Sequence, residues 1–261
     1  MKTLNSPWRK TAAAIYGAPK DSKLYGSVEI DITDVELFIA QKRKKGLKIT
    51  LTHVLASAVG KIIGKDIPEL NCYVKRGKIV QRNSVDASIS VLMKSGEMGS
   101  VIVKGVDKMS LQEVSNYINQ KVADVKQGEE TKATSNKHLL AKIPWPFRRW
   151  VFTLLKFIAV DQAISIKGLG LSPSGFGSFI LSNIGTLGLD LGFGALMPGS
   201  SVAMAMFIGS AKKKPVVIKD EVVIRKMLTV SVTLDHRIVD GKHGGMLFRG
   251  LNRRLNSLAE L

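Results

Sequence analysis

The sequence predicts a single α/β (or α+β) domain that extends over residues 1–261. Strand-like runs alternate with amphipathic helical segments, and short turns containing Gly or Pro separate them. With 261 residues, of which 45% are hydrophobic, the chain is long and apolar enough to bury a sizeable core. No long stretch has the composition of a disordered linker. We therefore expect one folded catalytic or binding unit rather than a string of modules.

The last two elements are predicted from residue spacing alone. Residues 227–234 alternate apolar and small polar side chains, which predicts a strand. Residues 244–261 carry apolar side chains at helical spacing, which predicts a helix; these are Met246, Leu247, Leu251, Leu255 and Leu258.

His236 lies between this strand and this helix, in the run Asp235-His-Arg-Ile-Val-Asp240-Gly241. The ends of strands often carry functional groups on a rigid scaffold, and histidine is well suited to accept a proton near neutral pH. His236 is therefore the first candidate for a general base. Taken alone, a histidine with an aspartate four residues later is more often structural than catalytic.

This run resembles the signature of the acyltransferase component of 2-oxo acid dehydrogenase complexes, and the related chloramphenicol acetyltransferases have a similar His-x-x-x-Asp-Gly. The resemblance extends to other blocks of the chain in the same order. It implies a chloramphenicol acetyltransferase-like two-layer sandwich of a mixed sheet and helices. The blocks are an opening helix at 6–11, a strand at 24–35, a helix at 48–63, a strand at 86–91, a helix start at 108–114 and a strand at 179–185.

The resemblance also implies roles for four side chains. His236 would act as the general base, and the hydroxyl of Ser182 would stabilise the tetrahedral oxyanion. Asp240 and Arg9 would form a pair that holds the active-site loop without taking part in the chemistry. Without the resemblance, Ser182 is more simply a turn residue at a strand end. Asp235 and Arg237 belong to the motif but receive no chemical role.

The same resemblance implies a homotrimer in which His236 of one chain meets Ser182 of another. Coenzyme A, as an acyl-CoA substrate, is the expected acyl donor, with the thioester of an acyl carrier or lipoyl group as the alternative. Because the similarity begins within the first ten residues, we expect no lipoyl group on this chain and a free-standing acyltransferase with an unidentified acceptor. Two alternatives stay open: a non-catalytic scaffold that retains the fold, and a dehydrogenase-complex core whose lipoyl domains are on another chain.

Other candidate sites are weak. Cys72 is the single cysteine, so no disulfide within the chain is expected, and we interpret it as a buried, inert thiol. The four histidines lack the paired spacing of metal ligands, so no metal site is expected. The glycines at 185–194 lack the Gly-Lys-Ser/Thr ending of a phosphate loop. The first residues have no apolar core of signal-peptide length, so a cytoplasmic protein is expected, with membrane association left open.

The formal net charge of +18 indicates either an anionic partner or a basic surface that faces solvent. Basic residues are spread along the chain, with small groups at 42–45 and 212–214. Aromatic residues make up only 6% of the chain, and no nucleic-acid-binding motif accompanies the charge. Nucleic acid is therefore not the expected partner. The phosphates of coenzyme A, an acidic carrier or anionic lipid fit better.

An apolar and basic insertion at about 129–175 departs from the family, which usually has a short connection there. Residues 143–160 contain two of the three tryptophans, with Phe and Leu beside Arg and Lys. This run is too short and too interrupted to span a bilayer, but its composition is that of an interfacial helix. The sequence leaves three possibilities: peripheral membrane contact, docking on the domain, or docking on a neighbouring subunit.

Overall fold

A six-stranded mixed sheet forms the centre of the domain, with the strand order β1-β8-β7-β6-β4-β5. The computed structural model describes residues 22–93, 96, 98–126, 142–166, 172, 175–197 and 199–258. Its strands are β1 (Lys23–Asp31), β2 (Cys72–Lys75), β3 (Lys78–Gln81), β4 (Ala87–Leu92), β5 (Met98–Val103), β6 (Phe179–Asn183), β7 (Met204–Ile218) and β8 (Glu221–Asp235). β2 and β3 form a separate antiparallel hairpin.

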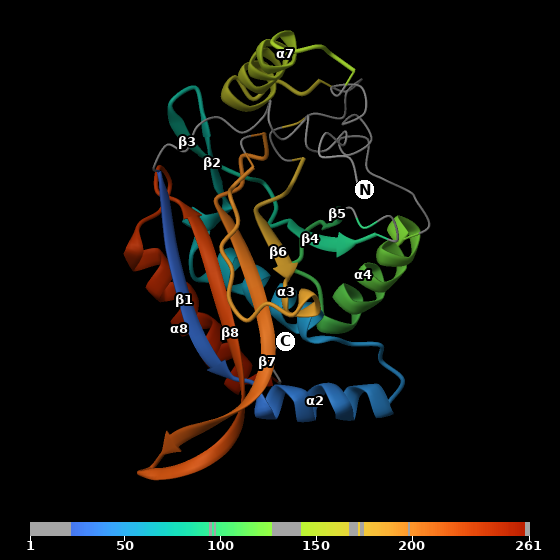
Figure 1. The fold of residues 1–261 in the computed structure, drawn as a ribbon, viewed down its shortest axis with the longest axis vertical. Helices are drawn as coiled ribbons and strands as arrows, with labels where there is room; N and C mark the ends of the chain where they lie inside the picture. The colour runs from blue at the N-terminus through green and yellow to red at the C-terminus, as the bar shows by residue number, and fades with distance from the viewer. Residues whose placement is uncertain are drawn as a thin grey trace.

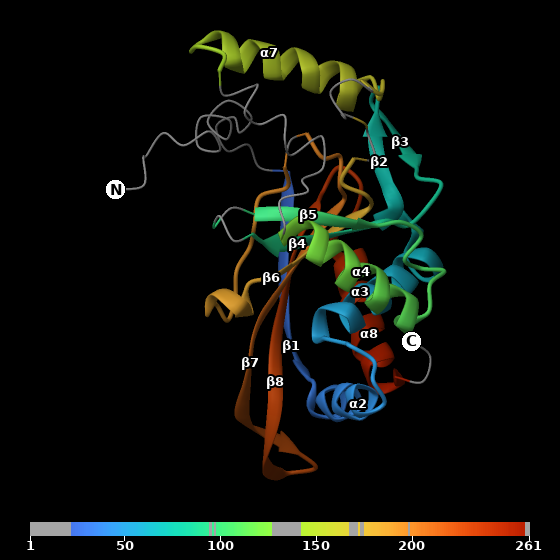
Figure 2. The same ribbon diagram turned by 90° about the vertical axis from the view of Figure 1, so that its right-hand side faces the viewer.

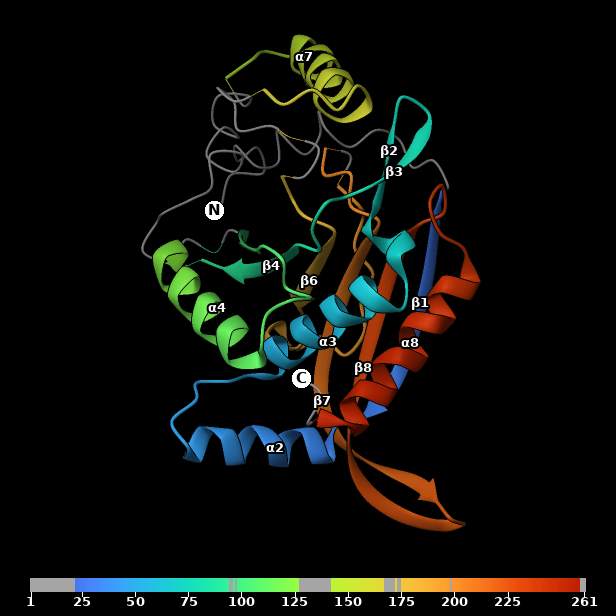
Figure 3. The same ribbon diagram turned by 180° about the vertical axis from the view of Figure 1, so that it is seen from behind.

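The main helices pack on one face of this sheet, so the domain has two layers (Figures 1, 2 and 3). They are α2 (Thr33–Lys44), α3 (Leu51–Lys65), α4 (Leu111–Lys126) and α8 (Gly241–Asn256). Short helical turns occur at η1 (Pro68–Asn71), η2 (Phe157–Asp161) and η4 (Gly185–Leu187), and α7 (Phe147–Lys156) lies apart from the other helices. The expected two-layer sandwich of mixed sheet and helices is confirmed.

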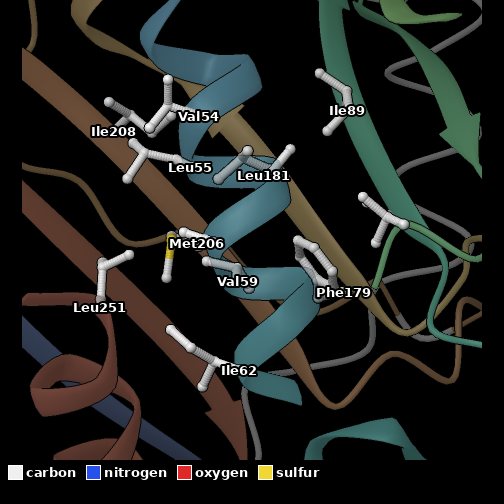
Figure 4. Packing of buried hydrophobic residues seen from close by; sticks show 14 of the residues in the cluster. Val54, Leu55, Val59, Ile62, Ile89, Phe179, Leu181, Met206, Ile208 and Leu251 are labelled. Carbon is white, nitrogen blue, oxygen red and sulfur yellow. The ribbon is translucent and has the colours of Figure 1, made fainter. Parts of the chain in front are cut away.

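Helix α3 is the centre of the core. Val54, Leu55, Val59 and Ile62 are fully buried and face the apolar side chains of β6 and β7, such as Met206 (Figure 4). The sheet covers α3 on one side, and α4 and α8 cover it on others. A helix with apolar residues on every side, as α3 has, is stable only when it is buried in this way. This packing fixes the positions of the strand ends that carry the candidate site.

Most elements expected from the sequence are present, with shifted boundaries. The expected strand at 24–35 ends at Asp31, because the Asp31 carboxylate accepts hydrogen bonds from the N–H and hydroxyl of Thr33 and helix α2 starts there. The expected strand at 227–234 is the second half of the longer strand β8. The expected opening helix at 6–11 lies outside the described residues.

Strands β7 and β8 continue beyond the sheet as a two-stranded arm. β1 pairs with β8 only as far as Met227, and β6 pairs with β7 only as far as Ile208. Lys219 and Asp220 form the two-residue turn, and both have positive φ angles, as such tight hairpins require. In Figure 1 this arm extends at the end of the molecule opposite α7.

Cys72 is half-buried rather than buried as expected, and it has no disulfide partner. It begins β2 on a small hairpin instead of lying within the main sheet, which explains its partial exposure. Burial raises the pKa of its thiol, and the charge of Glu69 raises it further. A thiol of this kind is a poor nucleophile near neutral pH.

Candidate functional site

His236 directly follows β8, and its position is fixed by two hydrogen bonds. The backbone N–H of His236 donates to the carbonyl oxygen of Ser22, just before β1, at 3.0 Å. The imidazole Nδ1 lies 3.0 Å from the carbonyl oxygen of Val239. A carbonyl oxygen can only accept a hydrogen bond, so Nδ1 carries the proton and Nε2 is left with a lone pair in the neutral ring. The side chain is exposed, so Nε2 is able to act as a base.

Asp235 and Arg237, which received no role from the sequence, form an ion pair around His236. Asp235 is only 5% exposed. Its carboxylate accepts a hydrogen bond from the Arg237 backbone N–H at 3.0 Å and from the guanidinium Nε and Nη2 at 2.9 and 2.5 Å. The hydrogen bond to Asp235 raises the pKa of Arg237, and the charge of Asp161 adds to this effect. The ion pair therefore joins the residues directly before and after His236 and restricts the turn that carries it.

Asp240 begins α8 as its N-cap. Its carboxylate accepts a hydrogen bond from the Lys242 backbone N–H at 3.1 Å, and the Nδ1 of His243 lies 2.9 Å from the same carboxylate. The Asp240 backbone N–H in turn donates to His243 at 3.1 Å, which completes a reciprocal cap. The expected partner Arg9 lies outside the described residues, so the Asp240–Arg9 pair stays a prediction.

Ser182 lies near the end of β6 and is half-buried. No hydrogen bond joins its hydroxyl to any part of the chain that the structure describes. The next residue, Asn183, donates from Nδ2 to the hydroxyl of Thr52 at 3.3 Å and so connects this strand end to the start of α3.

The structure does not bring Ser182 and His236 together within one chain. Ser182 is in register with Phe207 of β7, and Phe207 is in register with Ser231 of β8. His236 therefore lies five residues farther along β8 and two strands away, on the order of 20 Å from Ser182. A cavity of about 160 Å³ beside η1, lined by Asn71, Arg82 and Asp107 among others, includes neither residue.

The glycines after Ser182 allow backbone segments to approach closely. A Cβ on Gly185 would lie 2.5 Å from the carbonyl oxygen of Gly209, and a Cβ on Gly209 would lie 1.9 Å from that of Asp190. The segment after β6 thus packs directly on β7 at its irregularity between Ile208 and Ala211. A side chain at Gly185 or Gly209 would therefore prevent this close packing of the backbone.

No group of three or more His, Cys, Asp or Glu side chains suited to a metal ion occurs in the described ranges. His53, a second histidine in a helix-capping position, is 3% exposed. Burial and then the charge of Arg43 lower its pKa to about 4, so it is a neutral core residue. Among the described histidines, only His236 combines exposure with a fixed tautomer at a strand end.

Residues 8–136 and 170–261 match the family of 2-oxoacid dehydrogenases acyltransferase (catalytic domain). Among curated proteins, the chain is 24% identical over 217 residues to the dihydrolipoyllysine-residue acetyltransferase component of the pyruvate dehydrogenase complex of Rickettsia bellii. It is also 24% identical to the succinyltransferase component of the 2-oxoglutarate dehydrogenase complex of Buchnera aphidicola. The alignments cover 82% and 79% of this chain but only 41% and 39% of those proteins.

Solved structures share the fold. A probable dihydrolipoamide acetyltransferase from Listeria monocytogenes has a TM-score of 0.66 at 18% identity, covering 90% of this chain and 84% of that one. The dihydrolipoamide acetyltransferase of Azotobacter vinelandii, in which a serine, a histidine and an asparagine were investigated for roles in catalysis, has a TM-score of 0.64 at 16% identity, covering 90% and 82%. A chloramphenicol acetyltransferase has a TM-score of 0.51 at 13% identity, covering 90% and 89%.

Proposed function

Because this chain belongs to the 2-oxoacid dehydrogenase acyltransferase family, we propose that it transfers an acyl group between a thioester and an acceptor nucleophile. Coenzyme A is the proposed thiol that carries the acyl group. The observation that supports this most directly is the hydrogen bond from His236 Nδ1 to Val239, which leaves Nε2 free to accept a proton.

In the proposed reaction, His236 Nε2 removes the proton from the attacking thiol, hydroxyl or amine. The nucleophile forms a bond to the thioester carbonyl carbon, and the carbonyl oxygen becomes an oxyanion. The Ser182 hydroxyl donates a hydrogen bond to that oxyanion. When the carbon–sulfur bond breaks, the imidazolium returns its proton to the leaving thiolate, and His236 is neutral again.

The separation of Ser182 and His236 makes a site within one chain incompatible with this reaction. We therefore propose a homotrimer in which His236 faces Ser182 of the partner subunit. In support, both residues lie at strand ends, and neither side chain is fully buried in the single chain. Cyclic assembly repeats one such contact around the symmetry axis.

A pairing of histidine and serine also fits the Azotobacter vinelandii protein, where those two residue types were investigated together with an asparagine four positions after the histidine. In this chain the residue four positions after His236 is Asp240, which caps α8. Asparagine and aspartate cap helices equally well, so the change of residue type preserves that role.

The proposed function is tested by measuring thiol release from a panel of acyl-CoAs, and from acyl-dihydrolipoamide, with and without candidate acceptors. His236→Ala should lower the rate by several orders of magnitude, since a base that acts in both steps is lost. His243→Gln is the matched control, because glutamine retains the reciprocal cap with Asp240. A near-normal rate in His236→Ala would show that another group is the base. If the folded wild-type protein transfers none of these acyl groups, the scaffold alternative is favoured.

A further inference from the structure

Helix α7 presents a stripe of large apolar side chains to solvent. Phe147, Trp150, Leu154 and Phe157 follow one another at helical spacing, so they share one face. We call these four residues the aromatic stripe. Their exposed fractions are 62%, 75%, 59% and 51%, and Trp145 just before the helix is 64% exposed. An apolar face this large usually marks an interaction site.

The described part of the domain does not cover this stripe. No residue of α7 is buried. The segment is held instead at its C-terminal end, where the backbone N–H of Arg76 donates to the carbonyl oxygen of Asp161 at 2.9 Å. Within the segment, Lys156 forms an ion pair with the Asp161 carboxylate at 3.1 Å. The helix is therefore fixed to the β2–β3 hairpin while its apolar face stays open.

The charges around the stripe indicate the kind of partner. Residues 142–166, the described part of the segment outside the matched family regions, contain four Lys and Arg residues and a single acidic residue, Asp161. Arg149 is exposed and lies on the side of α7 away from the stripe. A second copy of α7 packed on the stripe would bring like charges together, because the segment 142–166 has an excess of basic residues. A surface with anionic groups above an apolar layer complements both properties of the helix.

We propose that α7 binds an anionic phospholipid membrane as an interfacial helix, with the aromatic stripe inserted among the headgroups and acyl chains. Tryptophan and phenylalanine tolerate this boundary, and arginine and lysine extend toward the phosphates. No helix in the described ranges is long and apolar enough to cross a membrane. The helix therefore lies in the plane of the interface and does not pass through it.

This attachment would orient the candidate site. α7 lies at the end of the molecule where β1 begins, opposite the β7–β8 arm (Figures 1 and 2). Lys23 at the start of β1 is in register with Asp235, the residue before His236. Asp161, where the segment is held, also acts electrostatically on Arg237. A membrane bound through α7 would thus face the end of the sheet that carries His236.

The test uses the full-length protein and vesicles of phosphatidylcholine with or without phosphatidylglycerol. Co-sedimentation is measured at low and high salt, together with the tryptophan emission spectrum. We expect binding only to the vesicles with phosphatidylglycerol, a decrease in binding at high salt because the attraction is screened, and a blue shift of emission on binding.

Two variants of α7 are compared with controls at the opposite end of the molecule. Trp150→Ser/Leu154→Ser removes apolar area, and Arg149→Glu reverses a charge; each should weaken vesicle binding by about tenfold or more. Val222→Ser/Ile224→Ser is the apolar control, because these arm residues are 73% and 74% exposed. Lys213→Glu is the charge control, since Lys213 is an exposed residue of the same arm. Both controls should bind much as the wild type does.

Three results would overturn the proposal. The first is a wild-type protein that stays in solution with phosphatidylglycerol vesicles at low salt. The second is vesicle binding that decreases in the arm variants but not in the α7 variants, which would assign the contact to the basic arm. The third is a smaller assembly in Trp150→Ser/Leu154→Ser than in the wild type, because α7 would then be a contact between copies of the chain.

Discussion

Asp235 and Arg237, the residues directly before and after His236, form an ion pair with each other. The Asp235 carboxylate is almost fully buried, and it binds both the backbone N–H and the guanidinium of Arg237. Because the two residues flank His236, their pairing restricts the backbone of the turn. Together with the His236–Ser22 and His236–Val239 hydrogen bonds, the pair positions the imidazole before any substrate is present.

Loss of this pair should affect both stability and activity. Arg237→Gln leaves a buried carboxylate without its cation, which should lower the free energy of unfolding by about 1–3 kcal/mol. It should also lower kcat by about tenfold or more, since the base would be less well placed. Denaturant unfolding and steady-state kinetics measure the two effects. The double variant Asp235→Asn/Arg237→Gln should lose less stability than the sum of the losses in the two single variants. Strictly additive losses would show that the two residues are not coupled.

Residue patterns and family blocks were enough to predict the two layers, the strand that leads to His236 and the helix after it. They did not predict the β7–β8 arm. Strand β7 contains Lys212, Lys213, Lys214 and Pro215, which interrupt the alternation of a half-buried strand. The arm tolerates them because no third strand pairs there, so the missing N–H of Pro215 costs no ladder hydrogen bond.

The candidate site was predictable in its parts but not in its arrangement. His236 and Ser182 were named from motifs, but their separation depends on sheet order and register, which are long-range properties. The role of Asp235 was missed because its partner is only two residues away, and such local pairs leave no periodic pattern. The cap at Asp240 could have been found from the sequence, since an Asp followed by a helical pattern is a helix-start signal.

Mixed assemblies test whether the site is shared between subunits. His236→Ala and Ser182→Ala should each be inactive, but equal mixing with dissociation and reassembly should restore activity. In a ring where each site takes one residue from each of two neighbours, about one quarter of the sites regain an intact pair. Activity is compared with that of each variant reassembled alone. No recovery in trimers verified to contain both variants would contradict a shared site.

Substitutions of Asp240 distinguish its role as the N-cap of α8 from any role of its negative charge in activity. Asp240→Ala removes the acceptor for the Lys242 N–H and should lower the free energy of unfolding by about 1 kcal/mol. Asp240→Asn retains a capping oxygen and should be close to wild type in stability. If Asp240→Asn is stable but loses activity, the negative charge has a further task, as the predicted pair with Arg9 requires. Chemical denaturation and acyl transfer are measured on the same preparations.

Gly209 should not tolerate a side chain. In Gly209→Ala the new Cβ would meet the carbonyl oxygen of Asp190, so the segment after β6 must move. We expect a loss of about 1–3 kcal/mol in unfolding free energy. Gly241→Ala is the control, because nothing lies within 4 Å of a Cβ at that position and alanine favours the helix it begins. Equal stability of the two variants would mean that the close approach is absent.

His53 should make the protein less stable in mild acid. Its buried side chain has a pKa of about 4, and its Nδ1 accepts a hydrogen bond from the Thr50 N–H at 3.2 Å. The unfolded chain has the ordinary value near 6.5, so between about pH 6.5 and 4 it binds a proton that the native state does not. Stability from this residue is therefore constant above about pH 6.5, falls as the pH decreases toward 4, and changes no further below that. The full loss is about 3 kcal/mol.

His53→Gln isolates this effect, because glutamine can still accept the hydrogen bond from Thr50 but does not titrate. Its unfolding free energy, measured by denaturant titration from pH 8 to 4, should depend less on pH than that of the wild type. Carboxylates elsewhere titrate equally in both proteins, so they cancel in the difference between the two curves. The difference should stay constant above about pH 6.5 and shift in favour of His53→Gln below it. Parallel curves over the whole range would show that native His53 binds its proton as readily as the unfolded chain does.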